Sequence, residues 1–392
     1  MAKFRRIGVL TSGGDAPGMN AAVRAVTRAA LSHGVEVVGI YEGYKGLIHK
    51  NFDVFHERDV DNIIGRGGTI LWSDRCDEFR YEEGILKAKA TCIDNDIDGI
   101  VAIGGDGTFR GATDFTKYGI PCIGLPGTID NDISSTDESI GFDTAMNTVI
   151  EMVDRLRDTC DSHRRCNVVE VMGRAAGYIA LEAGIATGAS AIAVKEIPFD
   201  EDAAIKKLIA QKESGKRNFI VMVAEGIPLD SAGDKQYSEK LAERIQKNTG
   251  IETKFARLAH VVRGGSPTLR DRLLAARMGD AAVERFLTVR VIWLFVCRMI
   301  ILLKWTLGTR FHSTVCTKER FSPENWKQNT LQNRLQICSV SVTRSLPHSK
   351  SCTILAIVFP IEKIVLTLRI VSQTYDTILY FYIVFGHLTL SL

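Results

Sequence analysis

The chain has 392 residues, of which 45% are hydrophobic and 24% charged, as is usual for a globular protein with more than one domain. Its formal net charge is +3, but twelve Lys or Arg and only four acids follow Arg285, so the preceding part is net acidic. This argues against a nucleic-acid-binding surface, which needs clustered positive charge. The apolar run at 7–10 is too short for a signal peptide. The nine cysteines form no CxxC pair, which favours reduced thiols in a cytoplasmic protein.

Apolar runs that predict strands alternate with stretches that predict helices. Strands are expected at 7–10, 35–41, 100–103, 122–125, 168–171, 191–194 and 219–224, and helices at 21–32, 147–157 and 175–186. This order predicts an α/β fold with mostly parallel sheets covered by helices. Ligands of such sheets bind beyond the carboxyl ends of the strands, and the Gly-rich turns of this sequence follow strands.

Two Gly-rich segments are candidates for binding phosphate and metal. In TSGGDAPGMN, at 11–20, paired glycines between a strand and a helix expose backbone N–H groups at a positive dipole end. A tight turn without a ligand is the alternative. GGDGT, at 104–108, places Asp106 at a strand end, where one carboxylate is enough for a Mg²⁺ carried by substrate phosphates. Alternatively, Asp106 only caps the next helix, and NAD kinases and lipid kinases have similar loops.

The segment PGTIDND, at 126–132, indicates phosphoryl transfer to an alcohol. That reaction needs a base beside the hydroxyl, a metal, and positive charge around the γ-phosphate. Asp130 and Asp132 are two residues apart, so both can face one side of an extended loop. One can act as the base while the other serves the metal environment or the structure. An Asx-rich turn without chemistry is the alternative.

These segments, together with VMGRAAG at 171–177 and RGGSP at 263–267, resemble the bacterial-type 6-phosphofructokinases in motif and in order, from about residue 3 to residue 283. The resemblance implies two doubly wound domains with the active site in the cleft between them. Residues 1–140 plus about 261–285 would bind ATP, and residues 141–260 would bind fructose 6-phosphate. The implied reaction moves the γ-phosphoryl group of Mg-ATP to the 1-hydroxyl of fructose 6-phosphate. A cytoplasmic homotetramer with sites shared between subunits is also implied.

The resemblance assigns roles residue by residue. Asp130 would be the general base, with Thr128 and Arg174 holding the γ-phosphate. ATP binding is implied for Gly14, Arg75, Cys76, Gly105, Asp106, Gly107 and Thr108, with Asp106 also serving Mg²⁺. Fructose 6-phosphate binding is implied for Thr128, Ile129, Asp130, Arg165, Met172, Gly173, Arg174, Glu225, Lys254, His260 and Arg263. An effector site is implied for Arg24, Arg28, Arg157 and Lys216.

Several positions distinguish this chain within the family. Gly107 and Gly127 match the ATP-using branch, whereas pyrophosphate-using enzymes, the alternative, carry Asp and Lys there. Lys254 replaces the usual Arg and loses its bidentate fork. Glu57 and Ser190 depart from the effector pattern, which weakens the expectation of allosteric control by a nucleoside diphosphate.

The family resemblance ends near Arg285. Residues 286–392 contain only two of the 34 Gly and one Ala, which indicates translation in a wrong frame or through an intron. A membrane tail is the rival interpretation, but the apolar run 286–303 is short for a spanning helix and contains Arg290 and Arg298. A catalytically impaired chain with a frameshifted or membrane-associating tail is therefore a further alternative.

Overall fold

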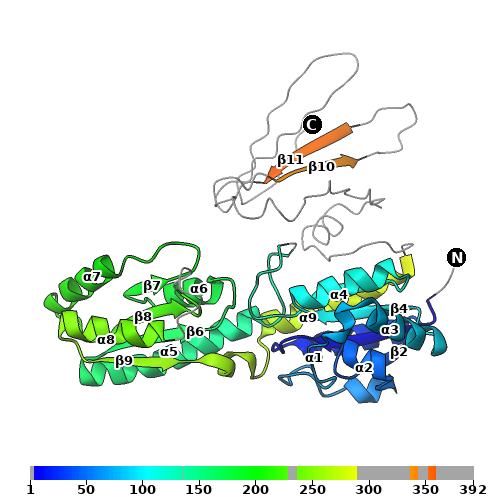
Figure 1. Ribbon diagram of the computed structural model, residues 1–392, viewed down its shortest axis with the longest axis horizontal. Coiled ribbons are helices and arrows are strands. Elements are labelled where there is room, and N and C mark those ends of the chain that lie inside the picture. The colour runs from blue at the N-terminus through cyan, green and yellow to red at the C-terminus, as the bar shows by residue number, and fades with distance from the viewer. Residues whose placement is uncertain (1–3, 135, 228–235, 289–335, 343–351, 359–392) are drawn as a thin grey trace, which may run out of the picture. The chain divides into compact units, whose positions relative to one another are not determined.

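The computed structural model describes residues 4–134, 136–227, 236–288, 336–342 and 352–358. The chain divides into two compact units, residues 1–303 and 304–392 (Figure 1). All predicted site residues lie in the first unit, which contains two separate β-sheets.

The first sheet has the strand order β3-β2-β1-β4-β5 and is parallel except for β3. Its strands are β1 (Arg6–Ser12), β2 (Glu36–Ile40), β3 (Phe52–Phe55), β4 (Gly99–Gly104) and β5 (Cys122–Pro126). The helices between them are α1 (Met19–Ser32), α2 (Tyr44–His49), the 3₁₀ helices η1 (Glu57–Val60) and η2 (Glu78–Arg80), α3 (Glu82–Asp94) and α4 (Asp106–Lys117).

Both faces of this sheet are covered, because its strands are apolar on both sides. Val9 and Val101 belong to one buried cluster, together with side chains of α1 and of α9 (Leu269–Thr288). Leu10 and Ile100 belong to a second cluster, with side chains of α2, α3 and α4. The sheet is therefore doubly wound, as expected from the alternation of strands and helices.

The second sheet has the order β7-β8-β6-β9 and is parallel throughout. Its strands are β6 (Cys166–Val171), β7 (Ala191–Ala193), β8 (Phe219–Ala224) and β9 (Thr253–Arg257). The accompanying helices are α5 (Phe142–His163), α6 (Tyr178–Ala186), α7 (Glu201–Glu213), α8 (Tyr237–Thr249) and the 3₁₀ helix η3 (Ala259–Arg263). After η3 the chain enters α9, which packs along α1. A Cβ at Gly279 would lie only 2.6 Å from Ala25 Cβ, so this close helix contact needs a glycine.

The predicted α/β class with mostly parallel sheets is confirmed, and the antiparallel β3 is an edge strand. Each predicted strand is present within about two residues of its expected bounds. Helix α5 begins at Phe142, five residues before the expected start at 147. The domain boundaries at 140 and 261 stay a prediction.

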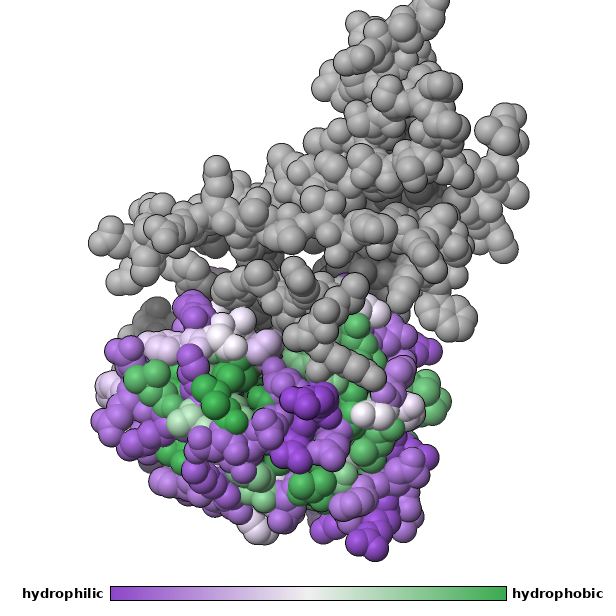
Figure 2. All heavy atoms as spheres, turned by 90° about the vertical axis from the view of Figure 1, so that its right-hand side faces the viewer, coloured by the Kyte–Doolittle hydropathy of each residue, from purple (hydrophilic) through white to green (hydrophobic). Residues whose placement is uncertain are grey.

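In the second unit the described residues form an antiparallel pair, β10 (Gln336–Val342) and β11 (Cys352–Val358). The rest of the predicted non-family tail, and the apolar run beyond residue 288, lie outside the described residues. Within the described ranges, no helix is both long and apolar enough to cross a membrane. Figure 2 shows hydrophilic and hydrophobic residues interspersed on the exposed face of the first unit that it presents.

Candidate active site

Three Gly-rich turns start side by side at the carboxyl edge of the first sheet. The strand register pairs Ser12 with Gly104 and Gly104 with Pro126, the last residues of β1, β4 and β5. The N–H of Gly127 donates to the carbonyl of Gly104 at 3.0 Å. The motifs that are separate in sequence are therefore neighbours at one edge, where parallel sheets bind their ligands.

The first two turns are held close together by small residues. A Cβ on Gly104 would lie 2.4 Å from both the Ser12 carbonyl oxygen and Thr108 Oγ1. Thr108 Oγ1 donates to the Ser12 carbonyl at 2.9 Å. Gly13 has φ +88°, a conformation that other residues rarely adopt. Helices α1 and α4 consequently begin at the same edge, and their positive dipole ends suit phosphate.

The segment 73–76, which carries Arg75 and Cys76, lies against the first turn. Ser73 Oγ donates to the Gly13 carbonyl at 2.6 Å, and the Gly13 N–H donates to the Asp74 carbonyl at 3.3 Å. Lys45 Nζ forms an ion pair with the Asp74 carboxylate at 2.8 Å. These contacts bring the predicted nucleotide residues Gly14, Arg75 and Cys76 into one region.

Asp130, the predicted base, is a buried carboxyl group with an exposed fraction of 6%. Its backbone N–H donates to Thr128 Oγ1 at 3.1 Å, whereas its Oδ1 has no hydrogen-bond partner among the described residues. Burial raises its pKa above the ordinary aspartate value. The charges that modify this pKa are, in order of effect, Arg263, Asp132, Arg174 and Glu225. A buried carboxylate whose oxygen lacks an internal partner is a candidate general base.

Arg174 and Glu225 reach this site from adjacent strands of the second sheet. The last residues of β6 and β8, Val171 and Ala224, are paired in register. Glu225 Oε1 accepts hydrogen bonds from the N–H groups of Gly173 at 3.2 Å and Arg174 at 2.6 Å. Arg174 has φ 52°, so this carboxylate stabilises a turn that is unfavourable for a non-glycine residue. Met172 and Gly173 belong to the same turn.

Arg263, at the end of η3, reaches the first Gly-rich turn. Its Nη1 donates to the Asp15 carbonyl at 3.1 Å. A Cβ built on Gly14 would lie 2.9 Å from the same nitrogen, so Gly14 leaves room for the guanidinium. His260 lies in the same short helix and is exposed. Arg263 therefore joins the nucleotide turn to the surroundings of Asp130.

Two predicted substrate residues, Arg165 and Lys254, both pair with Glu252, away from Asp130. Arg165 Nε pairs with Glu252 Oε2 at 2.7 Å, and Lys254 Nζ pairs with Glu252 Oε1 at 3.0 Å. Arg165 immediately precedes β6, and Lys254 lies at the start of β9. They therefore lie at the amino edge of the second sheet, opposite the edge from which Arg174 extends. Within one chain, the structure does not bring them to Asp130.

The predicted effector residues lie in two places. Lys216 Nζ donates to Ser190 Oγ at 3.0 Å, and burial followed by the charge of Arg157 lowers the pKa of Lys216. Arg157 donates to Asn218 Oδ1 at 3.2 Å and to the backbone carbonyl of Thr187, the C-cap residue of α6. The other two lie on α1, where Arg28 pairs with Asp61 at 3.2 Å and Arg24 Nε is buried without a partner among the described residues.

Asp106 offers one carboxylate for the implied Mg²⁺. It is the first residue of α4, its side chain is half-exposed, and it forms an ion pair with Arg110 at 2.7 Å. A Cβ on Gly107 would meet nothing within 4 Å, so there is open space beside it. Over the described residues there is no group of three or more His, Cys, Asp or Glu that would hold a metal alone. The arrangement fits a Mg²⁺ that takes most of its ligands from water and substrate phosphates.

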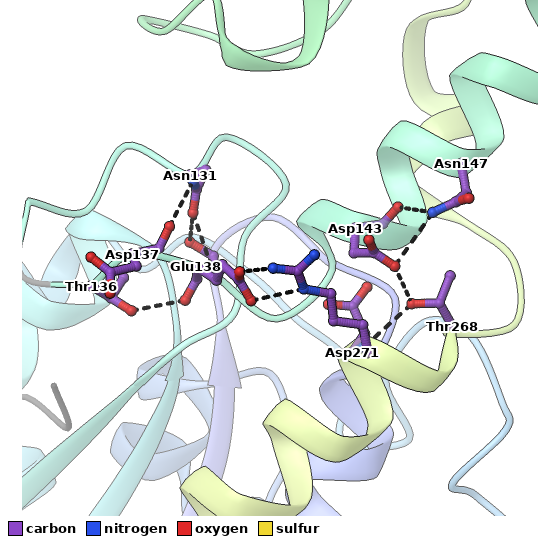
Figure 3. Close-up of polar contacts among 10 residues, drawn as sticks. Asn131, Thr136, Asp137, Glu138, Asp143, Asn147, Thr268 and Asp271 are labelled. Atoms are coloured by element: carbon purple, nitrogen blue, oxygen red, sulfur yellow. Dashed lines mark hydrogen bonds and ion pairs between the residues drawn. The ribbon is translucent and has the colours of Figure 1, made fainter. Parts of the chain in front are cut away.

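Asn131, between the two aspartates, has a structural role that the motifs did not predict. Asn131 has φ 50°, and its Oδ1 accepts from the N–H of Ser139 at 2.9 Å and from Ser139 Oγ at 3.0 Å. Its Nδ2 donates to the Asp137 carbonyl at 3.2 Å (Figure 3). Asn131 thus closes the loop that follows Asp130. The available signal was its residue type, because Asn tolerates positive φ and bonds nearby backbone.

Comparisons with known proteins agree with this architecture. The model of the family described as Phosphofructokinase matches residues 6–286. An ATP-dependent 6-phosphofructokinase from Halothermothrix orenii is 51% identical over 289 residues, which cover 72% of this chain and 87% of that protein. The structure of Pichia pastoris phosphofructokinase in the T-state is 40% identical with a TM-score of 0.68, and the match covers 74% of this chain but only 33% of that one.

A pyrophosphate-dependent phosphofructokinase from Marinobacter aquaeolei is also structurally similar. It is 22% identical, with a TM-score of 0.62, and the match covers 72% of this chain and 75% of that one. At this identity the likeness extends to the fold alone.

Proposed function

Because this chain belongs to the phosphofructokinase family, we propose that it transfers the γ-phosphoryl group of Mg-ATP to the 1-hydroxyl of fructose 6-phosphate. The observation that carries this proposal is the position of Asp130. It is buried, its Oδ1 lacks a partner among the described residues, and the charges of Arg174 and Arg263 act on it. These features suit a base that accepts a proton while positive charge stabilises the transferring phosphoryl group.

The proposed roles follow from this geometry. Asp130 accepts the proton of the 1-hydroxyl as the sugar oxygen attacks the γ-phosphorus and ADP leaves. Thr128 and the Arg174 guanidinium hold the transferring group, because Arg provides donors matched to phosphate oxygens. The Gly14 turn and Arg75 bind the nucleotide phosphates. A Mg²⁺ held by Asp106 would neutralise charge on those phosphates.

The contacts of Arg165 and Lys254 support a shared substrate site. His260 and Arg263 would bind the 6-phosphate within one chain, and Arg165 and Lys254 would serve the site of a neighbouring subunit. The support is their position at the amino edge of the second sheet, paired with Glu252 and away from Arg174. This is the basis for proposing a homotetramer, and we place the reaction in the cytoplasm.

The test is a coupled assay of the purified chain with fructose 6-phosphate and either ATP or pyrophosphate. The proposal expects fructose 1,6-bisphosphate formation with ATP and Mg²⁺, and none above background with pyrophosphate. Equal rates with the two donors would support the pyrophosphate-dependent alternative. No product with either donor, from soluble and folded protein, would support the catalytically impaired alternative.

A further inference from the structure

The first turn of α9 contacts the loop of residues 127–141, which carries Thr128 and Asp130, at two points that the proposed mechanism does not use. We propose that Asp271 is a positioning residue for Asp130: its carboxylate fixes the N-terminus of α5, and through it the backbone that holds Thr128 and Asp130. The inference rests on the proposed function, since it assigns the support of the same base.

Asp271 caps α5 from a distant part of the sequence. Its Oδ1 accepts from the Gly141 N–H at 2.8 Å, and its Oδ2 accepts from the Thr144 N–H at 2.8 Å and Thr144 Oγ1 at 2.5 Å. The side chain is almost fully buried, with an exposed fraction of 1%. Gly141, the N-cap residue of α5, has φ 103° and provides no side chain of its own. The cap that α5 lacks locally is therefore supplied by α9.

The contact continues directly to the catalytic segment. Ile140, which precedes Gly141, donates to the Pro126 carbonyl at 2.8 Å and accepts from the Thr128 N–H at 3.1 Å. Gly127 and Ile140 form an isolated parallel bridge. Thr128 Oγ1 in turn accepts from the Asp130 N–H. A hydrogen-bonded path thus runs from the Asp271 carboxylate through Gly141 and Ile140 to Asp130.

A second contact from α9 holds the same loop three residues before Gly141. Arg270 donates two hydrogen bonds to the carboxylate of Glu138 and forms an ion pair with it. Glu138 directly precedes Ser139, whose N–H and hydroxyl donate to Asn131. Thr268, the residue directly before α9, donates through Oγ1 to the Asp143 carboxylate at 2.6 Å. Arg270 and Asp271 of α9 therefore hold Glu138 and Gly141, which lie on either side of Ile140, the residue that bridges to Gly127.

The three donors around Asp271 require an acceptor with two oxygens. Asn at this position keeps the shape, but its NH₂ group would face the N–H of either Gly141 or Thr144. That buried N–H donor would then lose its acceptor. The base would then be misplaced, and small errors in the position of a catalytic group reduce turnover strongly. We expect Asp271→Asn to lower kcat about tenfold or more while KM for both substrates changes less than about twofold.

The test compares Asp271→Asn with three other single variants and one double variant of the full chain. Asp280→Asn removes an exposed carboxylate from the same helix and controls for charge. Ala275→Gly loosens the buried face of the same helix and controls for stability. Thr144→Val, alone and combined with Asp271→Asn, gives a double-mutant cycle in kcat. Of the three α9 variants, only Asp271→Asn should have a low kcat. In the double variant, the fold-reduction in kcat should be smaller than the product of the reductions caused by Asp271→Asn and Thr144→Val separately.

Hydrogen exchange of residues 127–141 is the second measurement, and it needs no activity. Faster exchange there in Asp271→Asn than in both α9 controls supports the proposal, even if the unmodified chain does not phosphorylate fructose 6-phosphate and the proposed function fails. Exchange equal to that of the controls overturns it. So does an active Asp271→Asn whose kcat loss matches that of Ala275→Gly.

Discussion

Gly127 packs directly against Ile103: a Cβ built on Gly127 would lie 3.0 Å from Ile103 Cγ2, and 3.3 Å from Met19 Cε. Gly107 is different, because a Cβ there would meet nothing within 4 Å. The two glycines that suggested ATP as donor therefore have different surroundings. A side chain at 107 would extend into open space beside Asp106, whereas one at 127 must first displace buried apolar groups.

This difference predicts distinct effects of the two substitutions found in pyrophosphate-using enzymes. Gly107→Asp should raise KM for ATP by about tenfold or more with little change in thermal stability, because it places negative charge where phosphates bind. Gly127→Lys should also lower stability, by about 1–3 kcal/mol, because it overpacks the core at Ile103. Steady-state kinetics and denaturant unfolding of each single variant check this. Equal stability losses in both variants would contradict it.

The second prediction concerns Asp130 itself. Asp130→Asn keeps the shape but cannot accept the proton, so kcat should fall by about 10²–10⁴-fold with similar KM values. The variant should be at least as stable as the unmodified chain at pH 7, because a buried carboxylate without a partner for its Oδ1 is unfavourable. Kinetics and unfolding are measured on the same preparation. A variant with near-normal turnover would rule out Asp130 as the base.

The pH dependence of the reaction should follow the raised pKa of Asp130. Because the base must be ionised, kcat/KM should rise with pH through a pKa above the ordinary value of 3.8. The charge of Arg263 opposes this shift, so Arg263→Gln should move the acid limb to still higher pH. An acid limb that stays in place in this variant would show that another group controls it.

The same raised pKa fixes the sign of the stability effect. The folded state binds the proton of Asp130 more tightly than the unfolded state does. The protonated side chain therefore contributes to the free energy of unfolding below pH 3.8, and this contribution is lost as the pH rises through the pKa of the folded state. Because Asn does not titrate, Asp130→Asn should abolish this pH-dependent loss of stability. Its stability should therefore fall less than that of the unmodified chain when the pH is raised across this range.

The sequence predicted well what is locally encoded. Buried parallel strands such as β4 and β8 are continuous apolar runs, and their bounds were close to the observed ones. The start of α5 was misplaced because its cap, Asp271, is 130 residues from Gly141 in sequence. Among the described helices, those that were not predicted are α2, α3, α4, α7, α8 and α9. In α3 and α7 the exposed faces are rich in charged residues and the apolar patterns are weak.

The site residues, too, were predicted where the signal is local in sequence and missed where it depends on distant contacts. The motifs indicated which residues meet at the edge of the first sheet, because parallel strands place their following turns together. The sequence did not reveal that Asp130 is buried, that Arg263 lies against Gly14, or that Asn131 closes the next loop. These relationships depend on packing between segments far apart in the chain.

Another prediction concerns the end of the family match, which extends to residue 286. Phe286 is buried, stacks at a tilt on Phe4 with ring centroids 4.8 Å apart, and lies against Gly99 at the start of β4. A chain stopped after Arg285 loses this side chain, and removing a buried Phe costs about 3–5 kcal/mol. A stop after Thr288, the end of α9, retains it. The shorter version should therefore unfold at a lower denaturant concentration than the longer one.

The full chain can be compared with a version that carries a family-like ending after Arg285. Residues 286–392 are rich in apolar residues and poor in Gly, and we predict that they give the chain low solubility or weak activity. Domain stabilities are only about 5–15 kcal/mol, so the absence of one packed helix of a family-like ending could exceed them. The family-like ending should recover soluble yield and ATP-dependent activity, both measured side by side with the full chain. If the full chain is already monodisperse, cooperative in unfolding and fully active, then its tail is a genuine structural element and the frameshift interpretation is wrong.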